Sequence, residues 1–261
     1  MSAQGEGGMG RRLKALLWDV DGTLAETEFE GHRHGFNLAF KEAGLPWHWD
    51  RATYRALLAV SGGRERLAAY GHQQGEAPWP QESLETIMAA KQRHYVNLVA
   101  EGGLALRPGV APLIAEAEAA GIPQAIVTTS SRSAVAALLG GLAPSISASF
   151  AFWVCGEDVA RKKPDPQGYQ LALDQLDPSP GSVVVLEDSV AGLAAATAAG
   201  LTCLVSLSDL SREEPAAGFL AAAAVVENLE PARGPVQVRH GPACDQTRVT
   251  LSYLHQLLER P

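Results

Sequence analysis

Residues 15–23 have the sequence Ala-Leu-Leu-Trp-Asp-Val-Asp-Gly-Thr, in which an apolar run ends directly at the two aspartates Asp19 and Asp21. The apolar run has the length and composition of a buried strand. The two acids allow two interpretations, because Asp-Gly is a common turn dipeptide and Asp-x-Asp-Gly can also open a calcium loop. This stretch alone therefore predicts a strand that ends in a polar turn, and the rest of the chain has to decide what the two acids do.

Further short apolar runs occur along the chain, and they are typical of strands that are buried on both faces of a parallel sheet. Helical segments alternate with these runs, and several of them stop at a glycine: Val110–Ala120, Ser131–Leu139 and Val190–Ala199. Such alternation predicts a doubly wound α/β fold with right-handed crossovers. The predicted strands are Ala15–Trp18, Gln124–Thr128, Phe152–Cys155, Val183–Leu186, Thr202–Ser206 and, more weakly, Ala223–Val226.

One long segment interrupts the alternation. Between Phe29 and Gly103 there is no strand pattern, and apolar residues recur at helical spacing. We interpret the stripe along residues 81–100 as core packing: Leu84, Ile87, Met88, Lys91, Tyr95, Leu98 and Val99. The sequence therefore predicts an α/β core at residues 13–26 and 104–261, an all-helical domain inserted at residues 27–103, and a closing helix at Thr247–Glu259.

Composition excludes several classes of protein. The 261 residues carry a formal net charge of −8, which disfavours non-specific binding to nucleic acid. The three cysteines form no CxxC pair, so a reducing compartment is the simpler interpretation. The Gly-rich residues 1–12 lack the apolar region of a signal peptide and predict a disordered tail, and no apolar run approaches the roughly 18 residues that a membrane span needs. We expect a cytoplasmic monomer without nucleic-acid or membrane partners.

Polar side chains come after four of the predicted strands, at residues 19–21, 128–131, 161–166 and 187–188. Because ligands bind beyond the carboxyl ends of the strands in an open parallel sheet, we expect these side chains to converge there. Asp19, Asp21 and Asp188 are hard oxygen ligands that suit Mg²⁺, and Glu187 is either a further ligand or a base for the metal waters. Together with a lysine and a threonine hydroxyl, they predict a phosphoryl-binding site.

These motifs resemble a known family. The segments DVDGT, a threonine after an apolar strand, KKP and VLEDSVAG are similar in order and spacing to the motifs of the haloacid dehalogenase (HAD) superfamily, and the helical insert looks like its subclass I cap. The resemblance implies a nucleophile at Asp19, a general acid and base at Asp21, and phosphoryl binding by Thr128. It also implies Lys163 as the motif lysine, with Lys162 as the alternative register, and Mg²⁺ on Asp19, the Asp21 carbonyl and Asp188, with Glu187 completing the acidic motif.

The segments DVDGTLAETE, GHRHGFN, WHWDRATYRALLAVSGGRERL and ALRPGV are more narrowly similar to the CbbY-type phosphatases. That resemblance implies Mg²⁺-dependent hydrolysis of xylulose-1,5-bisphosphate, a Rubisco inhibitor, to xylulose-5-phosphate through an aspartyl-phosphate. Two alternatives stay open within the fold, another small-phosphate hydrolase and a β-phosphoglucomutase-like phosphomutase. A HAD-fold binding protein without catalytic activity is a third alternative, which the complete set of acids and bases disfavours.

A bisphosphate needs a second anion site away from the metal. Gly62 and Gly63 precede a helix, whose start favours anions, and Arg64 adds a bidentate donor there. Composition alone favours solvated surface charges at Arg64 and Arg66; the resemblance favours phosphate binding at Arg64 and leaves both interpretations open at Arg66. The remaining candidate substrate contacts each have an ordinary alternative at the surface or in packing, and they are Glu28, His32, Tyr54, Thr129, Ser130 and Arg132.

Overall fold

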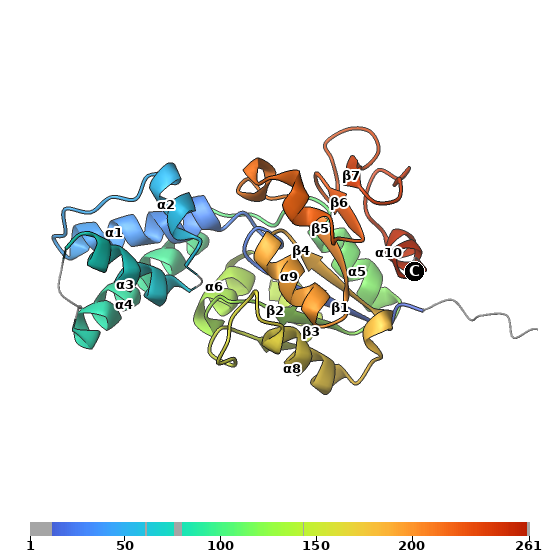
Figure 1. Ribbon diagram of the computed structural model, residues 1–261, viewed down its shortest axis with the longest axis horizontal. Helices are drawn as coiled ribbons and strands as arrows, with labels where there is room; N and C mark the ends of the chain where they lie inside the picture. Colours follow the sequence, from blue (N-terminus) through green and yellow to red (C-terminus); the bar gives the residue numbers. More distant parts are fainter. Residues whose placement is uncertain (1–11, 61, 76–79, 143, 260–261) are drawn as a thin grey trace, which may run out of the picture.

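The structure is a computed structural model that describes residues 12–60, 62–75, 80–142 and 144–259 (Figure 1). The predicted tail at residues 1–12 lies outside these ranges apart from Arg12. An α/β part and a purely helical part lie side by side (Figure 1). No helix in the described ranges is long and apolar enough to cross a membrane.

Seven strands form one sheet in the order β3-β2-β1-β4-β5-β6-β7. The first six strands pair in parallel, as predicted, and β7 pairs antiparallel with β6 at one edge. The strand β1 lies inside this order, between β2 and β4, so the residues after it emerge away from both sides of the sheet. The strands are β1 (Ala15–Trp18), β2 (Gln124–Val127), β3 (Phe150–Val154), β4 (Val183–Glu187), β5 (Thr202–Ser206), β6 (Ala224–Val226) and β7 (Val238–His240).

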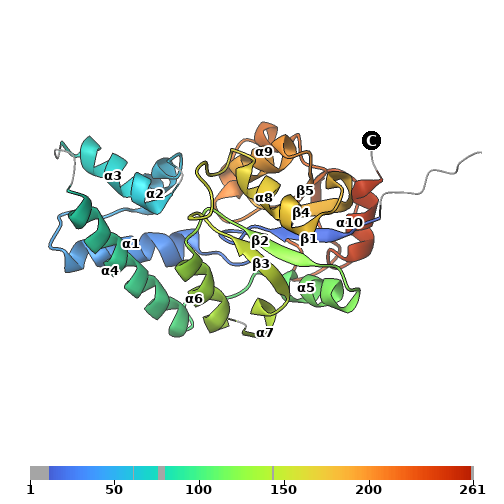
Figure 2. The same ribbon diagram turned by 90° about the horizontal axis from the view of Figure 1, so that it is seen from below.

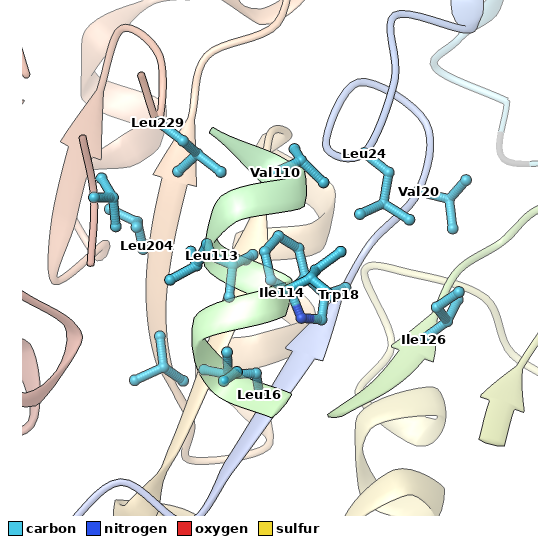
Figure 3. Packing of buried hydrophobic residues seen from close by; sticks show 14 of the residues in the cluster. Leu16, Trp18, Val20, Leu24, Val110, Leu113, Ile114, Ile126, Leu204 and Leu229 are labelled. Atoms are coloured by element: carbon cyan, nitrogen blue, oxygen red, sulfur yellow. The ribbon is translucent and has the colours of Figure 1, made fainter. Parts of the chain in front are cut away.

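Helices cover both faces of the sheet (Figure 2). Side chains of β1 alternate between two hydrophobic clusters, with Leu16 and Trp18 in one and Leu17 in the other. In the first cluster Leu16 and Trp18 lie against Ile114 of α5 (Figure 3). The helices of this part are α5 (Val110–Ala119), α6 (Arg132–Leu142), α7 (Pro144–Ser147), α8 (Gln167–Leu176), α9 (Val190–Ala198) and α10 (Leu251–Leu258), with short 3-10 turns at Pro180–Ser182, Ser211–Glu213 and Ala216–Phe219.

The helical part has a hydrophobic cluster of its own, in which Trp47 and Trp49 pack against Phe40. It consists of a π-helical turn η1 (Glu28–Arg33), α1 (His34–Glu42), α2 (Arg51–Leu57), α3 (Gly63–Gln73) and α4 (Gln81–Ala100). The predicted stripe on α4 divides between two environments. Ile87 belongs to the hydrophobic cluster of the helical part. Tyr95 and Val99 belong to the sheet cluster that contains Leu16 and Trp18, so α4 joins the two parts.

The chain crosses between the two parts twice, and the crossings touch. Ala25 forms an antiparallel bridge with Leu106, and the backbone N–H of Arg107 donates to the carbonyl of Leu24 at 2.8 Å. We expect any hinge between the two parts to lie at this junction, near Ala25–Thr27 and Gly102–Leu106. The division into domains at residues 27 and 103 stays a prediction.

Candidate active site

The two aspartates after β1 are held by strand pairing and by a tight turn. The backbone N–H of Asp19 donates to the carbonyl of Leu186 at 3.0 Å, which extends the pairing with β4 by one residue. Gly22 then turns the chain with φ +84°, and a Cβ at this position would clash with Oδ2 of Asp188. Only glycine fits both the conformation and the close approach, so the Asp-Gly dipeptide does serve as a turn.

Lys163 lies at the centre of the acidic groups. Its Nζ is 2.7 Å from Oδ1 of Asp19 and 2.7 Å from Oε1 of Glu187, and it donates to the carbonyl of Val127 at 2.8 Å. Lys162 points elsewhere and pairs with Glu65 of α3 at 2.9 Å. The geometry therefore brings Lys163 beside Asp19 and Lys162 to the helical part.

Glu187 is fully buried, and its oxygens are engaged by several donors. Oε1 accepts from the hydroxyl of Tyr169 at 2.7 Å as well as from Lys163, and Oε2 accepts from the hydroxyl of Ser189 at 3.2 Å. A buried carboxylate needs such partners, since desolvation of an unpaired charge is costly. Glu187 thus fixes Lys163 beside Asp19.

Oxygens of Asp19, Glu187 and Asp188 lie within 4.8 Å of one another. Burial raises the pKa of Asp19, and the positive charge of Lys163 offsets this only in part. Burial also raises the pKa of Asp188, with the charges of Asp19 and Glu187 adding to the effect. A group of buried carboxylate oxygens that lacks sufficient positive charge fits a hard divalent cation such as Mg²⁺.

Asp21 has a different environment. Its Oδ1 accepts from the hydroxyl of Thr27 and lies 2.9 Å from Nε2 of His32, and its Oδ2 accepts from the hydroxyl of Ser130. Burial opposes ionisation, but His32 and the two hydroxyl donors hold the pKa of Asp21 below its usual value. The roles that the family resemblance implies predict the opposite order of the two pKa values, with that of Asp19 lower, because the nucleophile should be ionised and the general acid should hold a proton. The surrounding donors are the physical reason for the difference.

Two adjoining cavities open beside these groups. The larger, of about 640 Å³, is lined by Asp19, Asp21, Lys163 and Asp188 from the α/β part and by Arg55 and Arg66 from the helical part. The smaller, of about 330 Å³, shares Asp21, Glu28, Arg66 and Thr129 with it. Together they form one cleft between the two parts, with room for a small ligand of several carbon atoms.

Comparison with known proteins assigns the fold and the motifs to one family. A family model described as haloacid dehalogenase-like hydrolase matches residues 13–200. The chain belongs to the haloacid dehalogenase-like hydrolase family. Its motifs and its relatives make it a phosphoric monoester hydrolase.

Several relatives share the name CbbY. The protein CbbY of Cereibacter sphaeroides is 49% identical over 212 residues, which are 79% of this chain and 89% of that protein. The protein CbbY of Rhodobacter capsulatus is 43% identical over 201 residues, or 77% and 88% of the two chains. A crystal structure of a CbbY mutant from Rhodobacter sphaeroides in complex with xylulose-(1,5)bisphosphate superposes with a TM-score of 0.77 at 44% identity, covering 83% of this chain and 94% of that one.

Most of the substrate-binding residues predicted for this HAD-family chain line the smaller cavity, namely Glu28, His32, Arg64, Arg66, Thr129 and Ser130. Thr128 does not line either cavity; it is buried beside them, and its hydroxyl accepts from the backbone N–H of Ser130 at 3.1 Å. These positions place one set of side chains around a ligand-sized space, with Thr128 just behind it.

The structure does not place two of the predicted substrate contacts in the cleft. Tyr54 is fully buried, and its hydroxyl donates to Glu28 at 2.7 Å and accepts from Arg66 at 3.0 Å, so it orients two cavity residues from behind. Arg132 begins α6, but its guanidinium turns outward to Asp158 at 2.5 Å. That acid holds it outside both cavities.

The structure also brings to the cleft three basic residues of this HAD-family chain that were not predicted as substrate contacts. Lys91 of α4 lines the smaller cavity and its Nζ lies 2.8 Å from Nδ1 of His32. Lys162 lines the same cavity, and Arg55 lines the larger one. A lysine within an otherwise apolar helical stripe was a usable signal for Lys91, because an ammonium is rarely buried without a partner.

Proposed function

We propose that the protein is a Mg²⁺-dependent phosphatase that acts on a sugar bisphosphate and that xylulose-1,5-bisphosphate is its substrate. The observation that carries the proposal is a cleft with two chemically different ends. Asp19 and Asp188 line one end, and Arg64 and Lys162 line the other. The similarity to CbbY, one structure of which is a complex with xylulose-(1,5)bisphosphate, supports this choice of substrate.

The charges favour the smaller cavity for the phosphate that is not cleaved. Arg64, Arg66, Lys91 and Lys162 line this cavity. Acids outnumber bases around the larger cavity, six to three, whereas the smaller cavity has four of each, so a second phosphate is less favoured in the larger cavity. Arginine binds phosphate with parallel donors, and the N-terminus of α3 beside it also favours an anion.

In this proposal Asp19 attacks phosphorus and becomes an aspartyl-phosphate, which water then hydrolyses. Lys163 holds the Asp19 carboxylate in place and stabilises negative charge on the phosphoryl group. Asp19, the Asp21 carbonyl and Asp188, with Glu187 beside them, would hold Mg²⁺, which when bound supplies further positive charge to the phosphoryl oxygens.

Asp21 has two tasks in this reaction. It donates a proton to the leaving oxygen and later accepts one from the attacking water. The donors around its carboxylate stabilise the ionised form, which suits the second task. For the first task Asp21 has to gain a proton and release one of these donors, and a substrate oxygen entering the cleft would take the place of that donor.

Phosphate release from a panel of esters tests the proposal. The panel contains xylulose-1,5-bisphosphate, ribulose-1,5-bisphosphate, xylulose-5-phosphate and β-glucose 1-phosphate, each with and without Mg²⁺. We expect kcat/KM for xylulose-1,5-bisphosphate to exceed that for the monophosphates at least about tenfold, because only a bisphosphate uses both ends of the cleft. Equal rates on all esters would contradict the substrate assignment. Conversion of β-glucose 1-phosphate without phosphate release would instead indicate a phosphomutase.

A first prediction concerns Arg64. We expect Arg64→Ala to raise KM for the bisphosphate about tenfold, or about 1.4 kcal/mol, and to leave KM for monophosphates nearly unchanged, because only the distal phosphate reaches this side chain. Steady-state kinetics on both substrate types measure the difference. Arg93→Ala is the control, since Arg93 pairs with Glu42 on the exposed side of the helical part. A similar rise in KM for both substrate types would remove Arg64 from the distal site.

A second prediction concerns pH. Burial lowers the pKa of Lys91 to about 8, so its positive charge is present below that pH and is lost above it. We expect kcat/KM to fall as the pH rises through about 8, because the neutral amine no longer supports His32 or attracts a phosphate. Lys91→Arg should move this fall to higher pH, whereas Lys91→Met should lower kcat/KM at neutral pH. If kcat/KM falls in the same way at alkaline pH in the wild type, Lys91→Arg and Lys91→Met, the role of Lys91 is disproved.

A further inference from the structure

A buried arginine lies where the two crossings between the parts meet. Only 6% of the Arg107 side chain is exposed. Its Nη1 donates to the carbonyls of Gly22 and Ser206, its Nη2 donates to the carbonyl of Leu207 at 2.6 Å, and its Nε lies 3.1 Å from Glu26. One guanidinium therefore joins the turn after β1, the end of β5 and the first crossing.

The segments that Arg107 joins are those that pack against Asp188. The α-carbon of Gly22 lies so close to Asp188 that a Cβ would clash with its Oδ2. Ser208 comes directly after Leu207, and its hydroxyl donates to the same oxygen of Asp188 at 2.6 Å. Arg107 thus acts on Asp188 through these two segments, which fix the carboxylate from either side.

The contacts require an arginine. A guanidinium has five donors in a rigid plane, and the four acceptors here come from three separate parts of the chain. A lysine ammonium at this position would have three donors on one atom and could not reach all four acceptors. Removal of the side chain would leave buried carbonyls without their donor and would free the Gly22 turn.

We propose that Arg107 is a positioning residue of the active site, which holds the Gly22 turn and Ser208 against Asp188 and so tunes the affinity of the acidic group for its divalent cation. The proposal rests on the proposed metal site of the hydrolase. Arg107 lies on the second crossing between the two parts, so this junction and the proposed metal ligand Asp188 are structurally coupled. Residues behind metal ligands commonly change metal affinity by ten- to a hundredfold when they are replaced, which is about the size of effect expected here.

Metal binding by the full chain tests this without relying on turnover. Isothermal calorimetry gives the Kd for Mg²⁺, and Mn²⁺ paramagnetic resonance gives an independent measurement. We expect Arg107→Lys to raise the Kd about tenfold and Ser208→Ala to raise it less. Arg212→Ala is the matched control with an expected change below about twofold, because Arg212 lies in the same segment but donates to Asp209, Glu227 and Asn228.

Chemical rescue separates a positioning role from a general loss of stability. In Arg107→Ala, we expect guanidinium at low millimolar concentration to restore part of the Mg²⁺ affinity, since it fits the space that the side chain vacated. If Arg107→Ala does not fold, Arg107→Lys and Ser208→Ala carry the test. Wild-type Kd values in the folded variants would overturn the role of Arg107. Absence of Mg²⁺ binding in the wild type would instead overturn the proposed metal site and the inference with it.

Discussion

Asp19→Asn is expected to lower phosphatase activity at least about 10⁴-fold, because an amide cannot replace the attacking carboxylate. The replacement preserves shape, so the fold should remain. Lys163 and Glu187 stay in place around the new side chain, and the loss of one of several buried acids relieves their mutual repulsion. We therefore expect the free energy of unfolding of the metal-free protein to stay equal or to rise while activity is lost.

Trapping of the phosphoenzyme distinguishes a nucleophile from a mere metal ligand. Borohydride reduces an acyl-phosphate to an alcohol, so wild-type protein quenched during turnover should contain homoserine at position 19, which peptide mass spectrometry detects. The Asp19→Asn protein should contain none. Asp174→Asn is the control, since Asp174 is exposed on α8. Substantial activity in Asp19→Asn, or a reduced residue elsewhere, would exclude the aspartyl-phosphate route at this position.

The sequence predicted the sheet well where strands are short, continuous and apolar. The runs at β1, β2, β4 and β5 are buried on both faces, so their composition alone identifies them. The edge strand β7 escaped prediction because Val238 is its only apolar residue and its pairing depends on β6. The helix α8 escaped for another reason, since it ends at Asp177 in the left-handed conformation and not at the glycine that marked the predicted helices.

The candidate site was predictable to the extent that it lies at strand ends. Asp19, Asp21 and Asp188 converge because parallel strands deliver them to one edge. The low pKa of Asp21 was not predictable in this way, since its donors come from two separate parts of the chain, Thr27 and His32 at η1 and Ser130 after β2. Such a combination depends on tertiary packing and leaves no local pattern in the sequence.

The side chain of Arg132, which points away from the cleft, shows the same dependence on tertiary packing. Arg132 lies at the start of a helix beside the threonine and serine run, where the sequence places it near phosphate. The structure pairs it with Asp158, which comes after another strand. A charged side chain of this length reaches in several directions, and its partner decides which one it takes.

Replacement of Lys163 is expected to have a large effect on both stability and activity, and replacement of the adjacent Lys162 is its control. Lys163 lies between two buried carboxylates, and its side chain is only 9% exposed. We expect Lys163→Met to lower the free energy of unfolding of the metal-free protein by about 3–5 kcal/mol, because it leaves Asp19 and Glu187 buried without their cation. It should also lower kcat by about 10²–10³-fold, through loss of charge stabilisation at the phosphoryl group.

Mg²⁺ should distinguish this loss from ordinary damage to packing. If the acidic group binds the cation, saturating Mg²⁺ should restore part of the stability of Lys163→Met, since it supplies positive charge to the same oxygens. Denaturant unfolding with and without Mg²⁺ measures both quantities. Lys162→Met should change the free energy of unfolding by less than about 1 kcal/mol, because its partner Glu65 is half exposed. Similar losses in the two variants, or the same loss with and without Mg²⁺ in Lys163→Met, would show that Lys163 does not balance a metal-binding group of acids.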